Sequence, residues 1–172
     1  MCKKFHFIGL GGAGCNALEF IYRQGIKAKY TCISYPERPE LPPDIRFIKY
    51  ARLTKRHLFE TGSLFKEDSK YVLLAGLGGD TGSNLLEELA SILWVRNKEF
   101  ILLCSLPFSF EGAQRRVIAG KVKTRFKSMD NFICFDLEEM RQIWGNVTLK
   151  VAFEKADKEF YNLFLTRGFS LN

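Results

Sequence analysis

The sequence predicts an α/β fold with three layers, in which helices cover both faces of a mostly parallel, Rossmann-like sheet. Two observations support this prediction. Apolar runs of strand length alternate with segments of helical character along the 172 residues, and two glycine clusters each follow an apolar run directly. Such alternation is typical of parallel sheets, because a parallel strand pair needs a long crossover that usually contains a helix. The length fits one domain, residues 1–172.

The first elements expected are two strands with a helix between them. Phe5–Gly9 is an apolar run that enters the first glycine cluster, and Gly14–Gln24 follows with a helix-like pattern. Lys29–Ser34 contains Thr, Cys and Ile, which favour extended structure. Residues 36–43 (PERPELPP) hold too many prolines for regular structure, so we expect a loop before the short strand Ile45–Lys49.

A second unit of strand, glycines and helix is expected in the middle of the chain. Tyr71–Ala75 (YVLLA) is fully apolar, as buried parallel strands are, and the glycine cluster of residues 76–82 follows it. Apolar residues at helical spacing between Leu85 and Leu93 then predict a helix. Phe100–Ser105 is the next apolar run and is expected to be another buried strand.

The remaining elements continue the alternation. We expect a helix over Gly112–Phe126, a strand over Asn131–Phe135, a short helix over Leu137–Trp144 and a final helix over Leu149–Leu165. One face of the final helix is expected to be an apolar stripe made of Leu149, Ala152, Phe153, Ala156, Phe160 and Phe164.

Composition restricts the class of protein and its surroundings. Hydrophobic residues make up 47% of the chain, and the net charge of +7 comes from scattered Lys and Arg. Basic and aromatic residues do not interleave as in RNA-binding modules, so nucleic acid is not an expected partner. The five cysteines form no C-x-x-C pair and predict a reducing, cytoplasmic setting without disulfides or zinc. No apolar run approaches the length of a membrane span.

Both glycine clusters are candidate phosphate-binding loops. Each follows a strand and precedes a helix, so both are expected at the sheet edge where the carboxyl ends of the strands meet. Glycines let a phosphate approach the backbone N–H groups, and a helix N-terminus adds about half a positive charge. A glycine-rich turn without a ligand is the alternative for a single cluster.

The first cluster also fits the G-x-G-x-x-G pattern of dinucleotide-binding units. Such a unit needs an acidic residue at the end of the second strand to hold a ribose. Here that strand ends at Ser34, and the nearest acid is Glu37, after a proline. A dinucleotide site would also leave residues 75–84 (AGLGGDTGSN) unexplained.

Three stretches together resemble the tubulin/FtsZ family. Residues 9–17 (GLGGAGCNA) are similar to the first phosphate loop of that family, residues 75–84 to its glycine-rich signature loop, and residues 106–115 (LPFSFEGAQR) to its KPFxFEGxxR motif. The AFxxAD spacing of residues 152–157 is similar to the start of the family's central helix. The motifs follow the family's order, and the resemblance implies a domain that binds GTP or GDP.

The resemblance also implies roles for individual residues. The phosphates would be held by backbone N–H groups and by two hydroxyl groups, from Gly11, Gly12, Ala13, Gly14, Gly78, Gly79, Asp80, Thr81, Gly82 and Ser83. The ribose and base would be contacted by Asn16, Glu111, Arg115, Phe153 and Asp157. In this scheme Phe153 stacks on the guanine and Asp157 accepts hydrogen bonds from its edge. The residues alone leave simpler alternatives: Phe153 as a core residue, Asp157 and Arg115 as solvated charges, and Glu111 and Thr81 as turn residues.

The sequence departs from the family pattern at positions that bear on function. Asp80 and Asn84 replace two signature glycines, and a carboxylate about 4 Å from a phosphate charge costs about 4 kcal/mol at an effective dielectric constant of 20. Asp80 therefore predicts weakened nucleotide binding or, alternatively, a ligand for Mg²⁺. A further glycine-rich loop of the family has no counterpart in residues 50–57, where the basic side chains available to replace it are Arg52, Lys55 and Arg56.

The largest departure concerns turnover. The family continues into a catalytic loop and a second, C-terminal domain, whereas this sequence stops at Asn172, so we expect no catalytic residue and little or no GTPase activity. The leading hypothesis is an FtsZ-like guanine-nucleotide-binding protein that modulates or caps a filament of full-length FtsZ-like subunits. The alternatives are a nucleotide-free pseudo-GTPase scaffold and an NAD- or FAD-dependent Rossmann enzyme.

Overall fold

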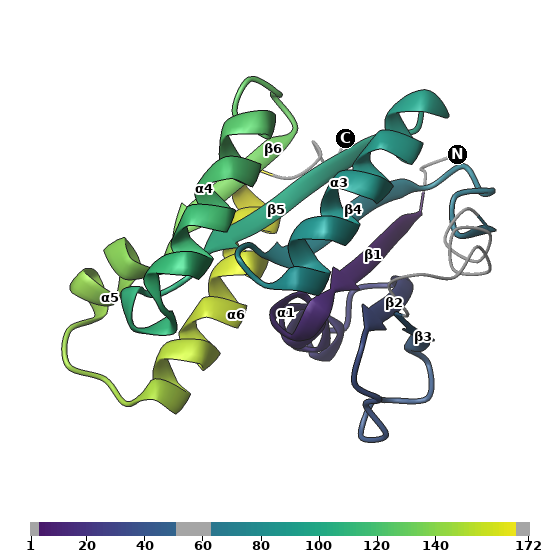
Figure 1. Cartoon of the computed structure of the whole chain (residues 1–172). Coiled ribbons are helices and arrows are strands. Elements are labelled where there is room, and N and C mark those ends of the chain that lie inside the picture. The colour runs from purple at the N-terminus through teal and green to yellow at the C-terminus, as the bar shows by residue number, and fades with distance from the viewer. Residues whose placement is uncertain (1–3, 51–62, 168–172) are drawn as a thin grey trace.

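Six parallel strands form a single sheet at the centre of the structure, a computed structural model that describes residues 4–50 and 63–167 (Figure 1). The strand order is β3-β2-β1-β4-β5-β6. The strands are β1 (Phe5–Leu10), β2 (Ala28–Ser34), β3 (Arg46–Lys49), β4 (Lys70–Gly76), β5 (Phe100–Leu106) and β6 (Phe132–Asp136). The predicted parallel α/β fold is confirmed.

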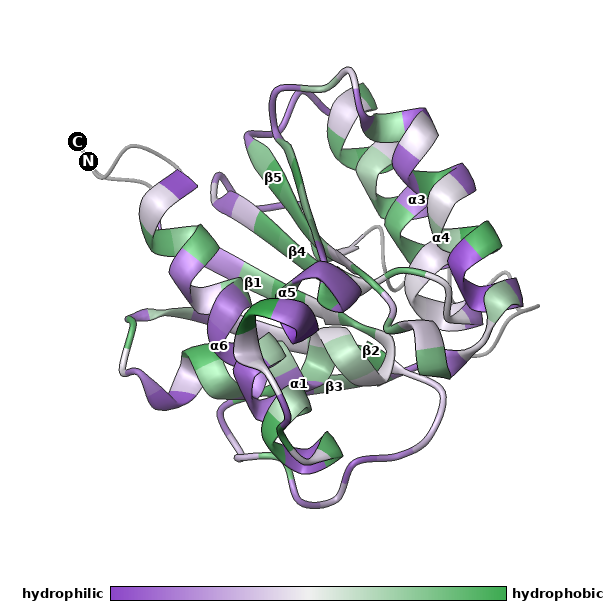
Figure 2. Cartoon of the chain, turned by 90° about the vertical axis from the view of Figure 1, so that its left-hand side faces the viewer, coloured by the Kyte–Doolittle hydropathy of each residue, from purple (hydrophilic) through white to green (hydrophobic). Residues whose placement is uncertain are grey.

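Helices connect the strands and form the two outer layers. They are α1 (Gly11–Arg23), α3 (Asp80–Val95), the 3₁₀ turn η1 (Ser109–Glu111), α4 (Ala113–Phe126), α5 (Leu137–Trp144) and α6 (Leu149–Arg167). Helices α3 and α4 cover one face of the sheet, and α1 and α6 cover the other (Figure 1). Figure 2 shows the apolar strands β4 and β5 between these helical layers.

The core is divided by the sheet into two hydrophobic clusters. Successive side chains of a strand point to opposite faces, so Ile8 and Leu73 pack with the leucines of α3, while Phe7 and Val72 pack with α1 and α6. Because both faces are covered, β1 and β4 are apolar almost throughout. Of the cysteines in the apolar runs expected to be strands, Cys32 and Cys104 are fully buried, whereas Cys134 on the edge strand β6 is partly exposed.

The direction in which successive strands are added to the sheet reverses between β1 and β4. From β1 it moves outward to β2 and β3, and it then returns to build β4, β5 and β6 on the other side. Leu10 at the end of β1 stands beside Ala75 of β4, so the two glycine clusters lie side by side at the carboxyl edge, as expected. A crevice at such a reversal is where open α/β sheets bind their ligands.

Two expectations about the helices need correction. Helices α1 and α3 begin inside the glycine clusters, at Gly11 and Asp80, because glycines can occupy the first turn of a helix as well as the turn before it. The stripe on α6 is also only partly buried: Leu149 and Phe153 are 60% and 43% exposed. They lie on the first turns of α6, ahead of the buried residues that pack on the sheet.

Candidate functional site

A cleft of about 480 Å³ opens at the carboxyl ends of β1 and β4. This volume falls in the range of small-molecule sites. Twelve of the fifteen residues predicted for nucleotide binding line it: Gly11, Gly12, Ala13, Asn16, Gly79, Asp80, Thr81, Gly82, Glu111, Arg115, Phe153 and Asp157. Residues as far apart in the sequence as Gly11 and Asp157 therefore line one cavity.

Two helix N-termini face this cleft. The residues that precede α1 and α3, Leu10 and Gly79, have extended backbones, and neither helix has a side chain that caps its first N–H groups. The first N–H groups of a helix have no partner within the helix, and the residues that carry them, Gly11–Ala13 and Asp80–Gly82, line the cleft. Together with two helix dipoles, this arrangement favours an anion such as a phosphate.

Gly14 lies outside the cleft and has a packing role. A Cβ atom on Gly14 would lie 2.1 Å from the Leu74 carbonyl oxygen, so α1 can approach β4 this closely only with glycine at this position. Its N–H group also lies beyond the first turn of α1, where N–H groups bond to carbonyl groups of the same helix. The geometry therefore assigns Gly14 to helix–sheet packing.

Gly78 and Ser83 line a neighbouring hollow instead of the main cleft. The Ser83 hydroxyl oxygen accepts from the Gly78 N–H group at 2.9 Å, so this hydroxyl holds the loop together. Gly78 has a φ of +94° and leaves no room for a side chain, since a Cβ atom would lie 2.5 Å from the Arg115 carbonyl oxygen. The signature loop is thereby pressed against α4.

Asp80 occupies the first position of α3 and is exposed. Its Oδ1 accepts from the Asn84 amide at 3.0 Å, one turn further along the helix. The two residues that depart from the family's signature pattern are thus bonded to each other. Thr81 is half-buried and lines the cleft beside them.

Glu111 and Arg115 form an ion pair at the far wall of the cleft. Glu111 Oε1 accepts from the Phe108 N–H group at 2.9 Å, and its Oε2 lies 3.2 Å from Arg115 Nη1. Glu111 therefore closes the η1 turn while it also faces the cavity. Arg115 is the exposed member of the pair and can turn toward a ligand.

Phe153 belongs to a small aromatic group at the mouth of the cleft. Its ring meets that of Phe108 edge to face, with centroids 5.4 Å apart, and lies near Phe110. Phe108 is buried, whereas Phe153 is 43% exposed. An exposed aromatic face beside a cavity suits stacking against a planar ring. The alternative in which Phe153 is a core residue is therefore wrong.

Asp157 lies one turn beyond Phe153 on α6, and both side chains line the cleft. Burial raises the pKa of Asp157 to about 7, and the charges of Glu19 and Glu154 act in the same direction. Arg38 opposes the shift by favouring the ionised form. A half-buried carboxyl group with this pKa is typical of functional sites.

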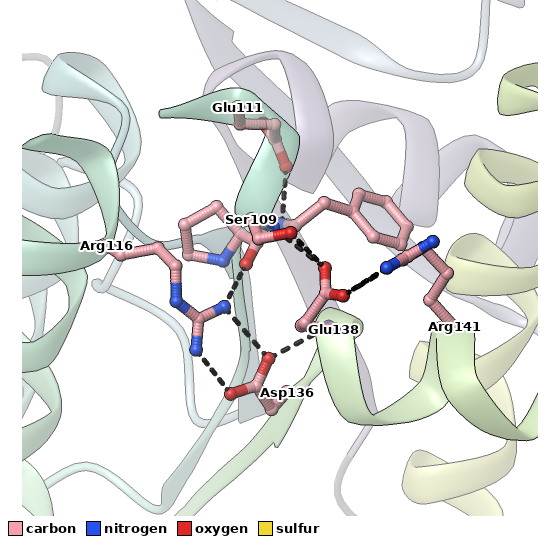
Figure 3. Close-up of polar contacts among 8 residues, drawn as sticks. Ser109, Glu111, Arg116, Asp136, Glu138 and Arg141 are labelled. Atoms are coloured by element: carbon pink, nitrogen blue, oxygen red, sulfur yellow. Dashed lines mark hydrogen bonds and ion pairs between the residues drawn. The ribbon is translucent and has the colours of Figure 1, made fainter. Parts of the chain in front are cut away.

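A polar network supports the loop that carries Glu111, and the sequence did not indicate it (Figure 3). Arg116 of α4 binds the carboxylate of Asp136 with two nitrogens, at 3.1 and 2.7 Å. Glu138 accepts from the backbone N–H and the hydroxyl of Ser109, at 2.9 and 2.8 Å, and pairs with Arg141. Residues from α4, β6 and α5 thus hold η1 in place.

Arg38 is a second residue next to the cleft that the sequence did not indicate. It belongs to the predicted loop of residues 36–43, which is irregular in the structure, yet its side chain is only 14% exposed. It reaches α1, where it donates to Asn16 Oδ1 at 2.7 Å and to Glu19 Oε2 at 3.0 Å. The available signal was its position, because loops that follow the carboxyl end of a parallel strand border the site.

The basic side chains proposed to replace a third glycine loop lie outside the described residues, at Arg52, Lys55 and Arg56. Within residues 4–50 and 63–167, no cluster of three or more His, Cys, Asp or Glu residues could hold a metal ion. No helix in this part of the chain is both long and apolar enough to cross a membrane.

The curated relatives of the chain are division proteins. It is 24% identical to cell division protein FtsZ 1 of Archaeoglobus fulgidus over 178 residues, which cover 88% of this chain and 46% of that protein. It is 25% identical to cell division protein FtsZ of Aquifex aeolicus over 175 residues, which cover 90% and 48%. The chain thus spans about half the length of these relatives. No protein-family model matches it.

Solved structures show the same fold. The FtsZ dimer of Methanocaldococcus jannaschii superposes with a TM-score of 0.81 at 24% identity, over 100% of this chain and 57% of that one. CetZ1 of Haloferax volcanii, solved as a GDP-bound monomer, has a TM-score of 0.70 at 19% identity, over 93% and 58%. Relatives and neighbours of the FtsZ/tubulin family therefore cover the whole chain, as expected for a divergent FtsZ-like domain.

Proposed function

We propose that this FtsZ-like domain binds a guanine nucleotide, GTP or GDP, in the cleft between β1 and β4. The observation that carries the proposal is that one cavity combines two kinds of group. Two helix N-termini without side-chain caps offer N–H groups to an anion, and α6 presents an aromatic ring and a carboxyl group to the same cavity. A nucleotide has this same division into phosphates and a base.

The proposal gives each part of the cleft a task. Backbone N–H groups of Gly11–Ala13 and Asp80–Gly82 bind the phosphates, with the Thr81 hydroxyl as a further donor. Phe153 stacks on the base, and Asp157 accepts from its imino and amino groups when ionised. Glu111 binds ribose hydroxyl groups, and Arg115 lies against the sugar.

Asp80 lowers the affinity for the phosphates in this proposal. Its carboxylate shares the start of α3 with the N–H groups that bind them, so it repels phosphate unless a cation intervenes. One carboxylate together with phosphate oxygens is a common set of ligands for Mg²⁺, which makes Asp80 the candidate metal contact. We also propose slow GTP hydrolysis, because the negative charge of the Asp80 carboxylate beside the phosphates disfavours further negative charge at that position.

Titration with fluorescently labelled GDP and GTP tests the proposal. We expect micromolar binding that Thr81→Ala and Phe153→Ala weaken at least tenfold, because each removes a direct contact. Asp80→Ala is expected to tighten binding in EDTA, because it removes a repelling charge. A loss of affinity in Asp80→Ala that appears only with Mg²⁺ assigns the metal contact instead.

Two results would overturn the proposal. If the protein does not bind millimolar guanine nucleotide, the cleft belongs to a nucleotide-free scaffold. If NAD or FAD raises the melting temperature and GDP does not, the site is that of a dinucleotide enzyme.

We extend the proposal to one partner, a full-length FtsZ-like subunit that the nucleotide-bearing face contacts at one end of a filament. The support comes from neighbours of the same fold, such as the TubZ protofilaments of Bacillus thuringiensis, with a TM-score of 0.70. Sedimentation with polymerised FtsZ tests it: substoichiometric protein should co-pellet and reduce the polymer mass. Unchanged polymer and no co-pelleting would refute a capping role.

A further inference from the structure

Arg38 is a half-buried cation that the proposed nucleotide contacts do not use. Its guanidinium group donates to Asn16 Oδ1 at 2.7 Å, to Glu19 Oε2 at 3.0 Å, to Glu40 Oε1 at 3.2 Å and to the Gly12 carbonyl oxygen at 3.4 Å. Two of these partners, Asn16 and Gly12, line the cleft, while Arg38 lies behind them. Arg38 therefore acts on a ligand only through other residues.

The contact with Asn16 determines which end of the Asn16 amide faces the ligand. A guanidinium group has only donors, so the atom that it meets 2.7 Å away must be the amide oxygen of Asn16. The NH₂ group then points away from Arg38, and among the described residues the structure gives it no acceptor. Asn16 is exposed and lines the cleft, so it offers a donor there.

Arg38 also acts on the acceptor at the same end of the cleft. The charged groups that influence Asp157 are Arg38 from the β2–β3 loop, Glu19 from α1 and Glu154 from α6. Arg38 is the cation among them, and it favours the carboxylate over the neutral acid. Only the carboxylate accepts hydrogen bonds with both of its oxygens.

We infer that Arg38 is a positioning residue that makes Asn16 a donor and keeps Asp157 an acceptor, and thereby sets the hydrogen-bonding pattern with which the cleft recognises a guanine base. This inference rests on the proposed function, because it assumes that the base lies at this end of the cleft. Guanine carries N–H donors next to ring and carbonyl acceptors, so it needs an acceptor and a donor from the protein.

Affinity for labelled GDP between pH 5.5 and 8.5 tests the inference. The wild-type affinity should fall below about pH 7, as Asp157 becomes protonated. Arg38→Gln should weaken binding about tenfold at pH 7.5 and move this midpoint to higher pH, because Asp157 loses its neighbouring cation. The matched control is Arg125→Gln, which removes one positive charge from an exposed pair with Glu87. Its affinity and midpoint should equal those of the wild type.

A double-mutant cycle separates the contribution of Asn16. The cycle is measured at pH 8.5, the highest pH of the series, because Asp157 is most fully ionised there and the contribution of Arg38 through this carboxyl group is smallest. The affinity loss from Arg38→Gln should then be clearly smaller in an Asn16→Ala background than in the wild type. Equal losses in both backgrounds would show that Arg38 does not act through Asn16.

The outcomes distinguish this inference from the proposed function. If the wild type does not bind GDP, the proposed function fails, and the inference fails with it. If the wild type binds and Arg38→Gln matches Arg125→Gln in affinity and midpoint, the inference alone is wrong.

Circular dichroism checks that each variant folds. If Arg38→Gln does not, Arg38→Lys carries the test, because it keeps the charge but lacks the planar fork that holds the amide. Arg38→Lys should keep the wild-type midpoint and lose affinity. An unchanged affinity overturns the inference.

Discussion

At the scale of single residues, glycines in the same loop have different tasks. Gly12 faces the cleft, and a Cβ atom there would meet no heavy atom within 4 Å. Gly14, two residues later, touches the backbone of β4 so closely that no side chain fits. A pattern such as G-x-G-x-x-G therefore combines residues that bind with residues that allow a helix to approach the sheet.

This difference predicts opposite results for two alanine substitutions. Gly14→Ala should lower the free energy of unfolding by about 3 kcal/mol or more, because the new methyl group meets the Leu74 carbonyl, which belongs to a central strand and cannot move freely. Gly12→Ala, the matched control, should change it by less than about 1 kcal/mol. Urea unfolding without nucleotide, followed by circular dichroism, measures both. Equal stability of the two variants would contradict the packing role of Gly14.

At the scale of elements, the loop after β5 is held by carboxylates from the β6–α5 junction (Figure 3). Hydrogen bonds from Arg141 and from the backbone and hydroxyl of Ser109 lower the pKa of Glu138 to about 2. Burial acts to raise the pKa of Asp136, but hydrogen bonds from Arg116 and from the Glu138 N–H group outweigh it and lower it. The walls of the cleft therefore depend on two carboxylates that must be ionised.

The sign of the pH dependence follows from these lowered pKa values. The carboxylate of Glu138 stabilises the fold above its ordinary pKa of 4.5, and this contribution is lost as the pH falls toward about 2. Glu138→Gln should therefore be less stable than the wild type at pH 7, and the difference should shrink as the pH approaches 2. Glu139→Gln is the control, because Glu139 is exposed on the same turn.

Urea unfolding at pH 7, 5 and 3 measures the free energy of unfolding of each variant. A difference between Glu138→Gln and the wild type that is as large at pH 3 as at pH 7 would show that the carboxylate charge is not responsible.

At the scale of the whole molecule, the interior strands β1, β4 and β5 are better protected than the edge strand β6. β1 and β4 each pair with strands on both sides and are covered by helices on both faces, and their residues are almost all buried. β6 is an edge strand whose five residues are all partly exposed. The cleft thus stands at the end of two buried strands that are paired on both sides, which suits a site built from backbone N–H groups.

Hydrogen exchange tests this distribution of stability. Amides of β1 and β4 should exchange slowest, close to the limit set by global unfolding, whereas those of β6 should exchange much faster through local opening. Mass spectrometry of peptic peptides after labelling reports both regions in one experiment. Equal protection of β6 and β4 would contradict the assignment of β6 as a weakly held edge.

Much of the fold could be predicted because it depends on local pattern. Apolar runs such as Tyr71–Ala75 and the alternation with helices determine a parallel sheet, and the glycine clusters locate its carboxyl edge. The order of the strands then brings Gly11 and Thr81 into one cleft. Element boundaries were less accurate, because a glycine can belong either to a turn or to the first turn of a helix.

By itself, the sequence determined the α/β class and the two loops, since these follow from spacing along the chain, and its resemblance to the tubulin/FtsZ family implied the residues that could line a nucleotide site. Only the tertiary structure decided which glycines pack and which face the cleft, that Phe153 is exposed, and that Asp80 is bonded to Asn84. It alone brought Arg38 behind Asn16 and Glu138 beneath Ser109. The physical reason is that such contacts join residues far apart in the chain, and no local pattern records the side chain that the fold will place opposite another.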